Sequence, residues 1–183
     1  MTTAKFYMVF DVESVGLHGE SFAVGWVVME PERFEVIDEG IIVARYASHT
    51  TGTNEWVEQN VISHLPAPTV HTPFQMREAF WATWREWAQR GAHLYADCGW
   101  PVEARFLAAC VDQARYSAQV RDRDGPFPLH EIADWYEAAG VREVERLPNE
   151  LPEHNPLNDA RASARGLAMA IKKLRGAGAC TAV

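Results

Sequence analysis

Residues 7–17 read YMVFDVESVGL, and this stretch decides the fold that the sequence predicts. Residues 6–11 are apolar up to Asp11, which is the pattern of a buried strand that ends in an acid. In an extended chain, side chains two positions apart point to the same face, so Asp11 and Glu13 should project together. Gly16 indicates that the chain then turns. We therefore expect two adjacent carboxylates where the first strand leaves the sheet.

Two carboxylates held close together repel each other, and each raises the pKa of the other unless a cation lies between them. A hard divalent metal with oxygen ligands is the usual reason for such an arrangement. A strand end with two solvated acids explains the pair equally well. The pair alone therefore leaves both interpretations open.

Outward from this stretch, the hydrophobic pattern alternates with period two and then changes to helical spacing. The predicted strands cover residues 6–11, 21–29, 34–46, 93–96 and 115–120. The predicted helices cover residues 55–60, 75–90, 101–113, 129–139 and a final segment that begins near residue 158. Three successive strands followed by alternating helices and strands predict an α/β fold with a central five-stranded mixed sheet flanked by helices.

Composition narrows the class of protein. The chain has 183 residues, 48% of them hydrophobic, which predicts one domain over residues 1–183. Its net charge of -8 argues against a protein that coats nucleic acid by bulk electrostatics. No apolar stretch is long enough to span a bilayer, and no secretory signal is visible. Three cysteines without metal-ligand spacing indicate reduced thiols and a cytoplasmic location.

A second cluster lies at residues 154–160, which read HNPLNDA. Asp159 stands at the expected start of the last helix and is able to bind a metal there. His154 lies on the irregular segment before that helix, where an imidazole is free to take a proton from water. A solvated histidine and an aspartate that caps the helix are the simpler explanation.

A third signal is Glu103 in DCGWPVEARFL, residues 97–107. It shares the inward stripe of its helix with Leu107 and Cys110, where a solvated glutamate is not expected. The alternative is a first-turn glutamate favoured by the helix dipole. Asp97, at the end of the fourth strand, is the competing acid.

Taken together, these three clusters resemble the DnaQ-like 3'-5' exonucleases of the DEDDh class. FDVESVGL (residues 10–17) is similar to the first motif DIETTGL, and HNPLNDA matches the third motif. DCGWPVEARFL is similar to the oligoribonuclease version of the second motif, GNSIGQDRRFL, but has Glu103 where Asp is usual and Cys98 where Asn is common. Asn155 excludes the tyrosine variant. WVEQNVISHLPAP (residues 56–68) resembles the RNase AS branch, and the resemblance covers roughly residues 7–174.

The resemblance implies a ribonuclease-H-like fold and a metal-dependent exonuclease that hydrolyses single-stranded 3' ends, with RNA favoured over DNA. It implies two divalent cations, Mg2+ or Mn2+, with Asp11 bridging both. Glu13 and Asp159 would complete the site that holds the attacking water, and Glu103, or Asp97 in its place, would serve the second cation.

The same resemblance implies that His154 is the general base. Leu17 would wedge against the terminal base, although a turn residue packed on the sheet explains it equally well. Trp100 is a candidate for stacking on a base. Many relatives are homodimers, so a homodimer is possible here. The alternative function is a catalytically silent domain of the same fold that binds nucleic acid or a protein partner.

Overall fold

The computed structural model describes residues 4–45, 55–114, 128–142 and 144–179. Its centre is one five-stranded sheet with the strand order β3-β2-β1-β4-β5. The strands are β1 (Phe6–Ser14), β2 (Ser21–Met29), β3 (Val36–Val43), β4 (Ala92–Ala96) and β5 (His130–Glu131). The β1–β2 and β2–β3 pairs are antiparallel, whereas β4 is parallel to β1 and β5 is parallel to β4. The predicted mixed α/β sheet is therefore confirmed.

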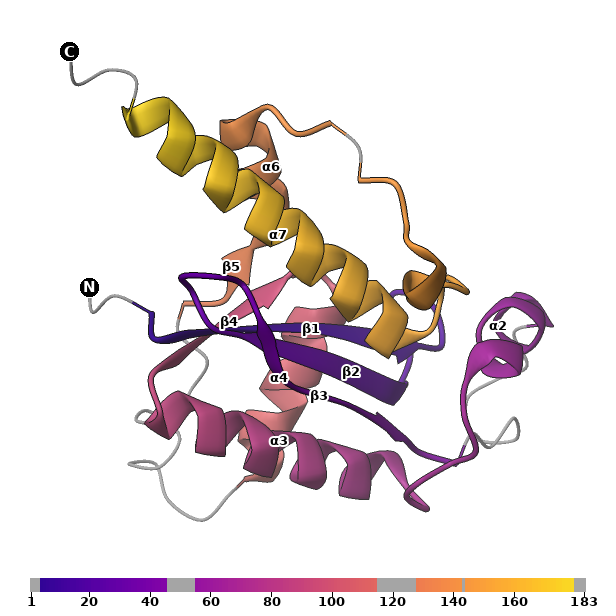
Figure 1. The fold of residues 1–183 in the computed structure, drawn as a ribbon. Coiled ribbons are helices and arrows are strands. Elements are labelled where there is room, and N and C mark those ends of the chain that lie inside the picture. Colours follow the sequence, from indigo (N-terminus) through magenta and orange to yellow (C-terminus); the bar gives the residue numbers. More distant parts are fainter. Residues whose placement is uncertain (1–3, 46–54, 115–127, 143, 180–183) are drawn as a thin grey trace.

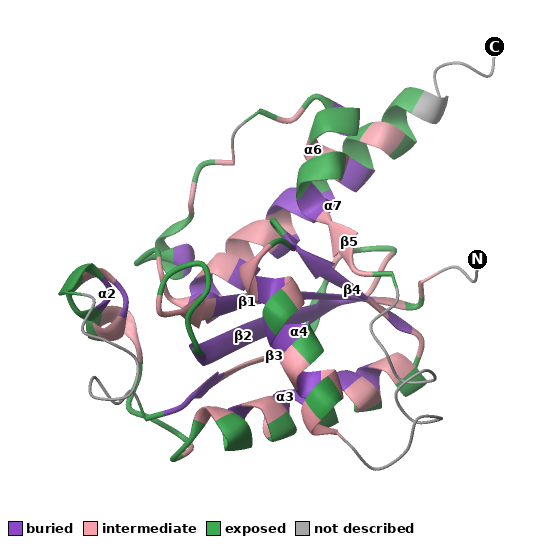
Figure 2. Ribbon diagram, turned by 180° about the vertical axis from the view of Figure 1, so that it is seen from behind, coloured by how far each residue is buried: buried purple, intermediate pink, exposed green. Residues whose placement is uncertain are grey.

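Helices cover both faces of this sheet (Figure 1). The helices are α2 (Glu55–Asn60), α3 (Pro73–Gln89), α4 (Val102–Gln113), α6 (Ile132–Ala139) and α7 (Pro156–Ala179), with 3-10 turns at Ile62–His64 and Pro148–Glu150. On one face α3 and α4 bury aromatic side chains such as Phe80 and Phe106 against the sheet. On the other face α6 and α7 pack Ile132 and Leu167 against it. Of the strands between them, β1, β2 and β4 are largely buried (Figure 2).

Several predicted boundaries differ from the structure. The first strand continues to Ser14, so Glu13 is a strand residue. The third is shorter than predicted, because Phe34 takes a left-handed conformation (φ 62°) in the turn before Val36. The prediction of helix from residue 129 was wrong at its start, because His130 and Glu131 pair with β4 before α6 begins. The fifth strand predicted at residues 115–120 lies outside the described residues.

The final helix begins at Pro156, two residues earlier than predicted, so Asp159 lies within its first turn. Its N-terminal end packs over β1 and β2, at the edge where β1 ends (Figure 1). In the described part of the chain, no helix combines the length and the apolarity needed to cross a bilayer.

Candidate metal centre and active site

The end of β1 carries two acids to the face of the sheet that α7 covers. Side chains alternate along a strand. Phe10 and Val12 pack in the core on the α3 and α4 side, whereas Val9 packs with α7 residues. Asp11 and Glu13 lie two and four residues after Val9 along β1, so their side chains project from the same face, toward α7. This is the shared face that the sequence predicted for the pair.

The first turn of α7 brings Asp159 to the same place. The side chain of Asn155 caps this helix, because its Oδ1 accepts hydrogen bonds from the backbone N–H groups of Leu157 (3.2 Å) and Asn158 (3.4 Å). Asn155, and not Asp159, therefore caps this helix. The Asp159 carboxylate instead accepts the backbone N–H of His154 at Oδ2 (3.0 Å) and raises the pKa of Asp11 and Glu13.

Gly25 allows this close approach of α7 to the sheet. It lies directly opposite Asp11 in the β1–β2 pair. A Cβ atom on Gly25 would lie 2.3 Å from the backbone nitrogen of Leu157 and 2.4 Å from the backbone carbon of Pro156. These are backbone atoms of the α7 N-terminus, so they are unable to move aside as a flexible side chain would. The missing side chain at Gly25 therefore lets the start of α7 lie against the strand pair next to Asp11.

We expect Gly25→Ala to displace the start of α7 and to destabilise the protein by about 1–3 kcal/mol, the usual cost of overpacking. Because Asp159 moves with the helix, Mn2+ should stabilise this variant less than it stabilises the wild type. Chemical denaturation with and without Mn2+ measures both effects. Gly176→Ala is the control, since a Cβ there meets nothing within 4 Å. Equal destabilisation of both variants would contradict the role of Gly25.

Glu103 reaches the acid pair from the other side of the sheet edge. It lies in the first turn of α4, is 9% exposed, and accepts a hydrogen bond from the backbone N–H of Val12. Its charge raises the pKa of both Asp11 and Glu13. Asp97 follows β4, and its charge raises the pKa of both Asp11 and Glu103. Glu103 thus lies close to both acids of the pair, and we keep it as the proposed ligand, with Asp97 as the substitute.

His154 lies at the rim of this acid cluster, which we define as Asp11, Glu13, Glu103 and Asp159. Potential ligand atoms of Glu13, His154 and Asp159 all lie within 4.8 Å of one another. His154 has a left-handed backbone conformation (φ 60°), which only a minority of non-glycine residues adopt. The structure therefore places the imidazole beside Glu13 and Asp159, and its role as general base stays a prediction.

Trp56, to which the sequence motif assigned no role, contacts His154. Its ring meets the ring of His154 edge to face, with 5.1 Å between the centroids, and the side chain is 53% exposed. The neighbouring 3-10 turn is bonded to the same segment, because Asn155 Nδ2 donates to the carbonyl of His64 (2.9 Å). In the sequence, the available signal for this residue was a tryptophan within a short, mostly polar helix.

Burial and mutual repulsion raise the pKa values of the cluster. The pKa of Asp11 is raised well above its usual range by burial and then by the charge of Glu13. Burial, followed by the charges of Asp159 and Glu103, raises the pKa of Glu13 to about 8. Burial raises the pKa of Glu103 to about 7. Burial also raises the pKa of Asp159, although a hydrogen bond from Arg146 opposes that increase.

This donor set fits a hard divalent cation. Glu13 and Asp159 lie together beside His154, and the charges of Asp159 and Glu103 raise the pKa of both Asp11 and Glu13, so a positive charge between these acids would be favourable. Oxygen ligands of this kind are preferred by Mg2+ and Mn2+, whereas structural zinc sites use cysteine and histidine. Of the cysteines in the described residues, Cys110 is buried on the opposite side of the sheet and Cys98 is exposed beyond β4. The residues present therefore suit Mg2+ or Mn2+.

Leu17 and Trp100, the two predicted substrate contacts, are both on the surface. Leu17 lies in the turn between β1 and β2 and is 63% exposed, and Trp100 precedes α4 and is 69% exposed. Leu17 also lines a cavity of about 280 Å³, with Val102 and Arg105 of α4 on the other side. Leu17 is thus not packed on the sheet, and a role for either residue in binding substrate stays a prediction.

Comparison with known proteins supports the fold. No model of a protein family matches the sequence, and no curated protein matches it. Among solved structures, the chain is similar to the nuclease domain of 3'hExo, a DEDDh family member bound to rAMP, with 13% identity and a TM-score of 0.55 over 92% of each chain. It is similar to cell-death related nuclease 4 (14% identity, TM-score 0.51), of which it covers 64% while 92% of this chain is matched.

A third similar structure is the zinc-bound complex of E. coli ExoI with single-stranded DNA. The identity is 10% and the TM-score 0.58, over 95% of this chain and 41% of the ExoI chain. At identities this low, the similarity to these structures shows a shared backbone fold. The chain therefore has the ribonuclease-H-like fold of the DEDDh 3'-5' exonucleases, as the order of its motifs predicted.

Proposed function

We propose that this protein is a metal-dependent 3'-5' exonuclease that acts on single-stranded nucleic acid. One observation carries the proposal: the end of β1 and the first turn of α7 bring Glu13 and Asp159 within 4.8 Å of each other and of His154. The charge of Glu103, at the start of α4, raises the pKa of both Asp11 and Glu13 at the same strand end. Such an arrangement is costly without a cation. The acids and the histidine also follow one another along the sequence in the order of the three DnaQ-like motifs that the chain resembles.

In this proposal Asp11, Glu13 and Asp159 would hold one divalent cation, and Asp11 and Glu103 would hold the second. When bound, the two ions would neutralise the charge that develops on the phosphate and on the leaving 3'-oxygen. His154 takes a proton from the attacking water, which hydrolyses the last phosphodiester bond. The products are a nucleoside monophosphate and a chain with a new 3'-hydroxyl end.

Exposed apolar side chains on either side of the cluster support a single-stranded substrate. Trp56 contacts His154, whereas Leu17 lies beyond the end of β1, so terminal bases could pack against both. Aromatic faces bind bases without reading the sequence, which suits an enzyme that trims ends. The proposed preference for RNA rests on the oligoribonuclease-like second motif and on the resemblance of residues 56–68 to the RNase AS branch. A homodimer stays a prediction.

The decisive experiment uses RNA and DNA oligonucleotides labelled at the 5' end, with Mn2+ or with EDTA. We expect a ladder that shortens from the 3' end, faster for RNA, and full loss of activity in EDTA. Circular single strands of the same sequence should stay intact, because they offer no 3' end. Binding of the oligonucleotides without hydrolysis would instead support the silent-domain alternative, and cleavage of the circles would indicate an endonuclease.

A further inference from the structure

Arg146 places a guanidinium group against the acid cluster. Its Nη1 lies 2.5 Å from Asp159 Oδ1, and its Nε lies 3.3 Å from Glu153 Oε1. Its charge also opposes the rise in the pKa of Asp97. The side chain is 28% exposed, so this contact is partly shielded from water. Arg146 lies on the irregular segment before α7, eight residues before His154.

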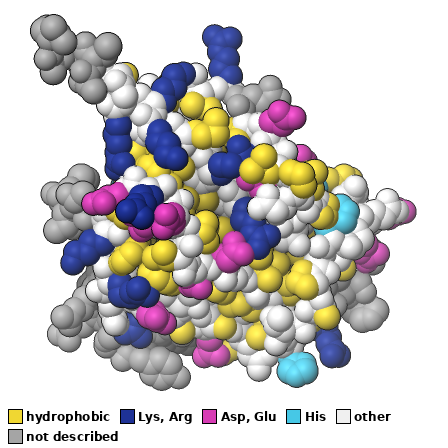
Figure 3. Space-filling view, viewed as in Figure 1, with side chains coloured by type: hydrophobic (Ala, Val, Ile, Leu, Met, Phe, Trp, Pro, Cys, Tyr) yellow, Lys and Arg dark blue, Asp and Glu magenta, His cyan; other side chains and the backbone are white. Residues whose placement is uncertain are grey.

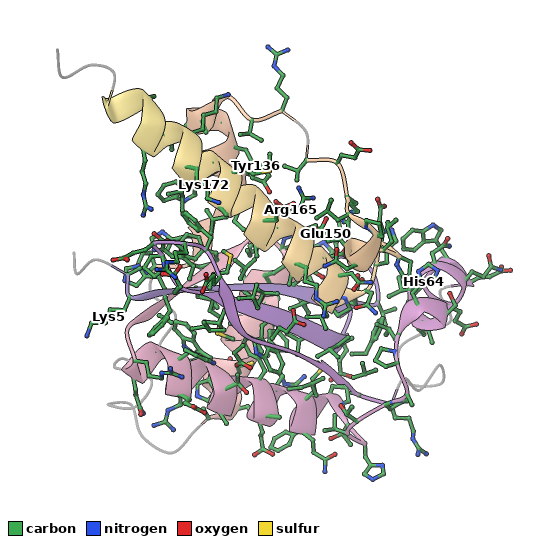
Figure 4. All side chains as sticks on the ribbon, in the orientation of Figure 1. Lys5, His64, Tyr136, Glu150, Arg165 and Lys172 are labelled. Carbon is green, nitrogen blue, oxygen red and sulfur yellow. The ribbon has the colours of Figure 1, made fainter. Side chains whose placement is uncertain are left out.

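A buried ion pair fixes the backbone of Arg146. The Glu150 side chain is 3% exposed and accepts hydrogen bonds from Arg165 Nε (2.6 Å) and Nη2 (2.7 Å). The same Glu150 carboxylate accepts the backbone N–H of Leu147 (2.8 Å), and Arg165 Nη2 also donates to the carbonyl of Glu145 (2.5 Å). The peptide groups on both sides of Arg146 are thus hydrogen-bonded to the Glu150–Arg165 ion pair. Figure 4 shows this pair between α7 and the preceding segment.

This pair also fixes Arg146 relative to the metal ligand. Asp159 and Arg165 lie within two turns of each other on α7, so a rigid element connects the carboxylate to the anchor. In addition, Arg146 Nη1 donates to the carbonyl of Glu150 (3.1 Å). Basic side chains gather over this face of the molecule around α7, with apolar side chains between them (Figure 3). The position of Arg146 is therefore built into the fold and is not that of a freely moving surface side chain.

The contact has a consequence for metal binding. In the structure, Oδ2 of Asp159 is bonded to the N–H of His154 and Oδ1 to Arg146. A metal that binds Asp159 must share or displace these donors. A guanidinium and a divalent cation also repel each other strongly at a few ångströms in a partly buried site. Both effects weaken binding of the cation.

We propose that Arg146 is a positioning residue of the metal centre, which holds the Asp159 carboxylate in the metal-free protein and competes with the metal for Oδ1. This inference rests on the proposed function, because it requires that Asp159 binds the metal. It predicts that Arg146 keeps the Asp159 carboxylate oriented before the metal binds and that it lowers the affinity of the site for the metal.

The test is calorimetric titration of the full-length protein with Mn2+. We expect Arg146→Gln to bind Mn2+ about tenfold more tightly than the wild type, because a competing positive charge is removed. The same variant should have a lower melting temperature without metal, since the acid cluster loses its partner. Arg146→Met keeps the apolar stem and loses the charge, so it provides the same test if the glutamine variant does not fold.

Arg161→Gln is the matched control. Arg161 lies on α7, the helix that carries Asp159, and forms an ion pair with Glu39 at 2.5 Å. Its side chain is 27% exposed, similar to that of Arg146, but its partner lies on β3 outside the acid cluster. Unchanged Mn2+ affinity in Arg146→Gln, or equal tightening in Arg161→Gln, would overturn the inference. Failure of the wild type and of every variant to bind Mn2+ would instead refute the proposed metal site itself.

Discussion

Asp11→Asn should abolish the nuclease activity and at the same time stabilise the metal-free protein. Asp11 lies at the centre of the cluster, where the charges of Glu13, Asp159, Glu103 and Asp97 all act on it. The amide is a poor metal ligand, so we expect a loss of activity of roughly 10³-fold or more, the scale on which metal-assisted charge stabilisation contributes. The neutral amide also removes repulsion, and about 1 kcal/mol of stabilisation should raise the melting temperature by about 2–4 °C.

The stability of the metal-free protein should also depend on pH. Glu13 and Glu103 have folded-state pKa values of about 8 and about 7, above those of an unfolded chain. Between about pH 5 and 8 the native protein thus holds more protons than the unfolded chain, and stability falls as pH rises. Stability should therefore decrease across this window in EDTA, less steeply in Asp11→Asn, and Mn2+ should reduce the decrease in the wild type.

Thermal unfolding at several pH values, in EDTA and in Mn2+, measures these effects beside the activity assay. Glu86→Gln on α3 is the control, because this exposed residue loses the same charge on the opposite side of the sheet. If Asp11→Asn melts below the wild type in EDTA, the carboxylates do not repel each other as we infer. If it retains activity, Asp11 is not a ligand.

His154→Ala should lose about 10²–10⁴-fold in rate, the usual contribution of a general base, yet keep its affinity for Mn2+. The imidazole lies near Glu13 and Asp159, but in our proposal it moves a proton and does not hold the ions. Single-turnover hydrolysis and Mn2+ titration separate the two roles. His154→Asn is a second variant, because asparagine tolerates the left-handed backbone that this position requires.

The control for this prediction is His71→Ala, which removes an exposed histidine from the turn before α3. It should leave the rate unchanged. Equal rates for His154→Ala and the wild type would discredit the assignment of the base. A loss of Mn2+ affinity that parallels the loss of rate would make His154 a ligand in place of a base.

Much of this protein follows from its sequence alone. Period-two patterning identified the strands of the β1–β3 meander, and helical spacing identified α3, α4 and α7. These patterns are local, since each depends on which face of one element meets the core. The pairing of Asp11 with Glu13 is local for the same reason. The order of the three motifs then predicted which distant segments would meet.

The tertiary structure alone decided the parts of the site that depend on contacts between segments. Gly25 carries no sequence signal, yet its missing side chain admits the start of α7 beside Asp11. Arg146 lies in a segment without periodicity, and its position comes from an ion pair between Glu150 and Arg165. Trp56 reaches His154 only because the turn after α2 is bonded to the segment before α7. Periodicity records how one element faces the core, whereas these contacts depend on how two elements approach each other.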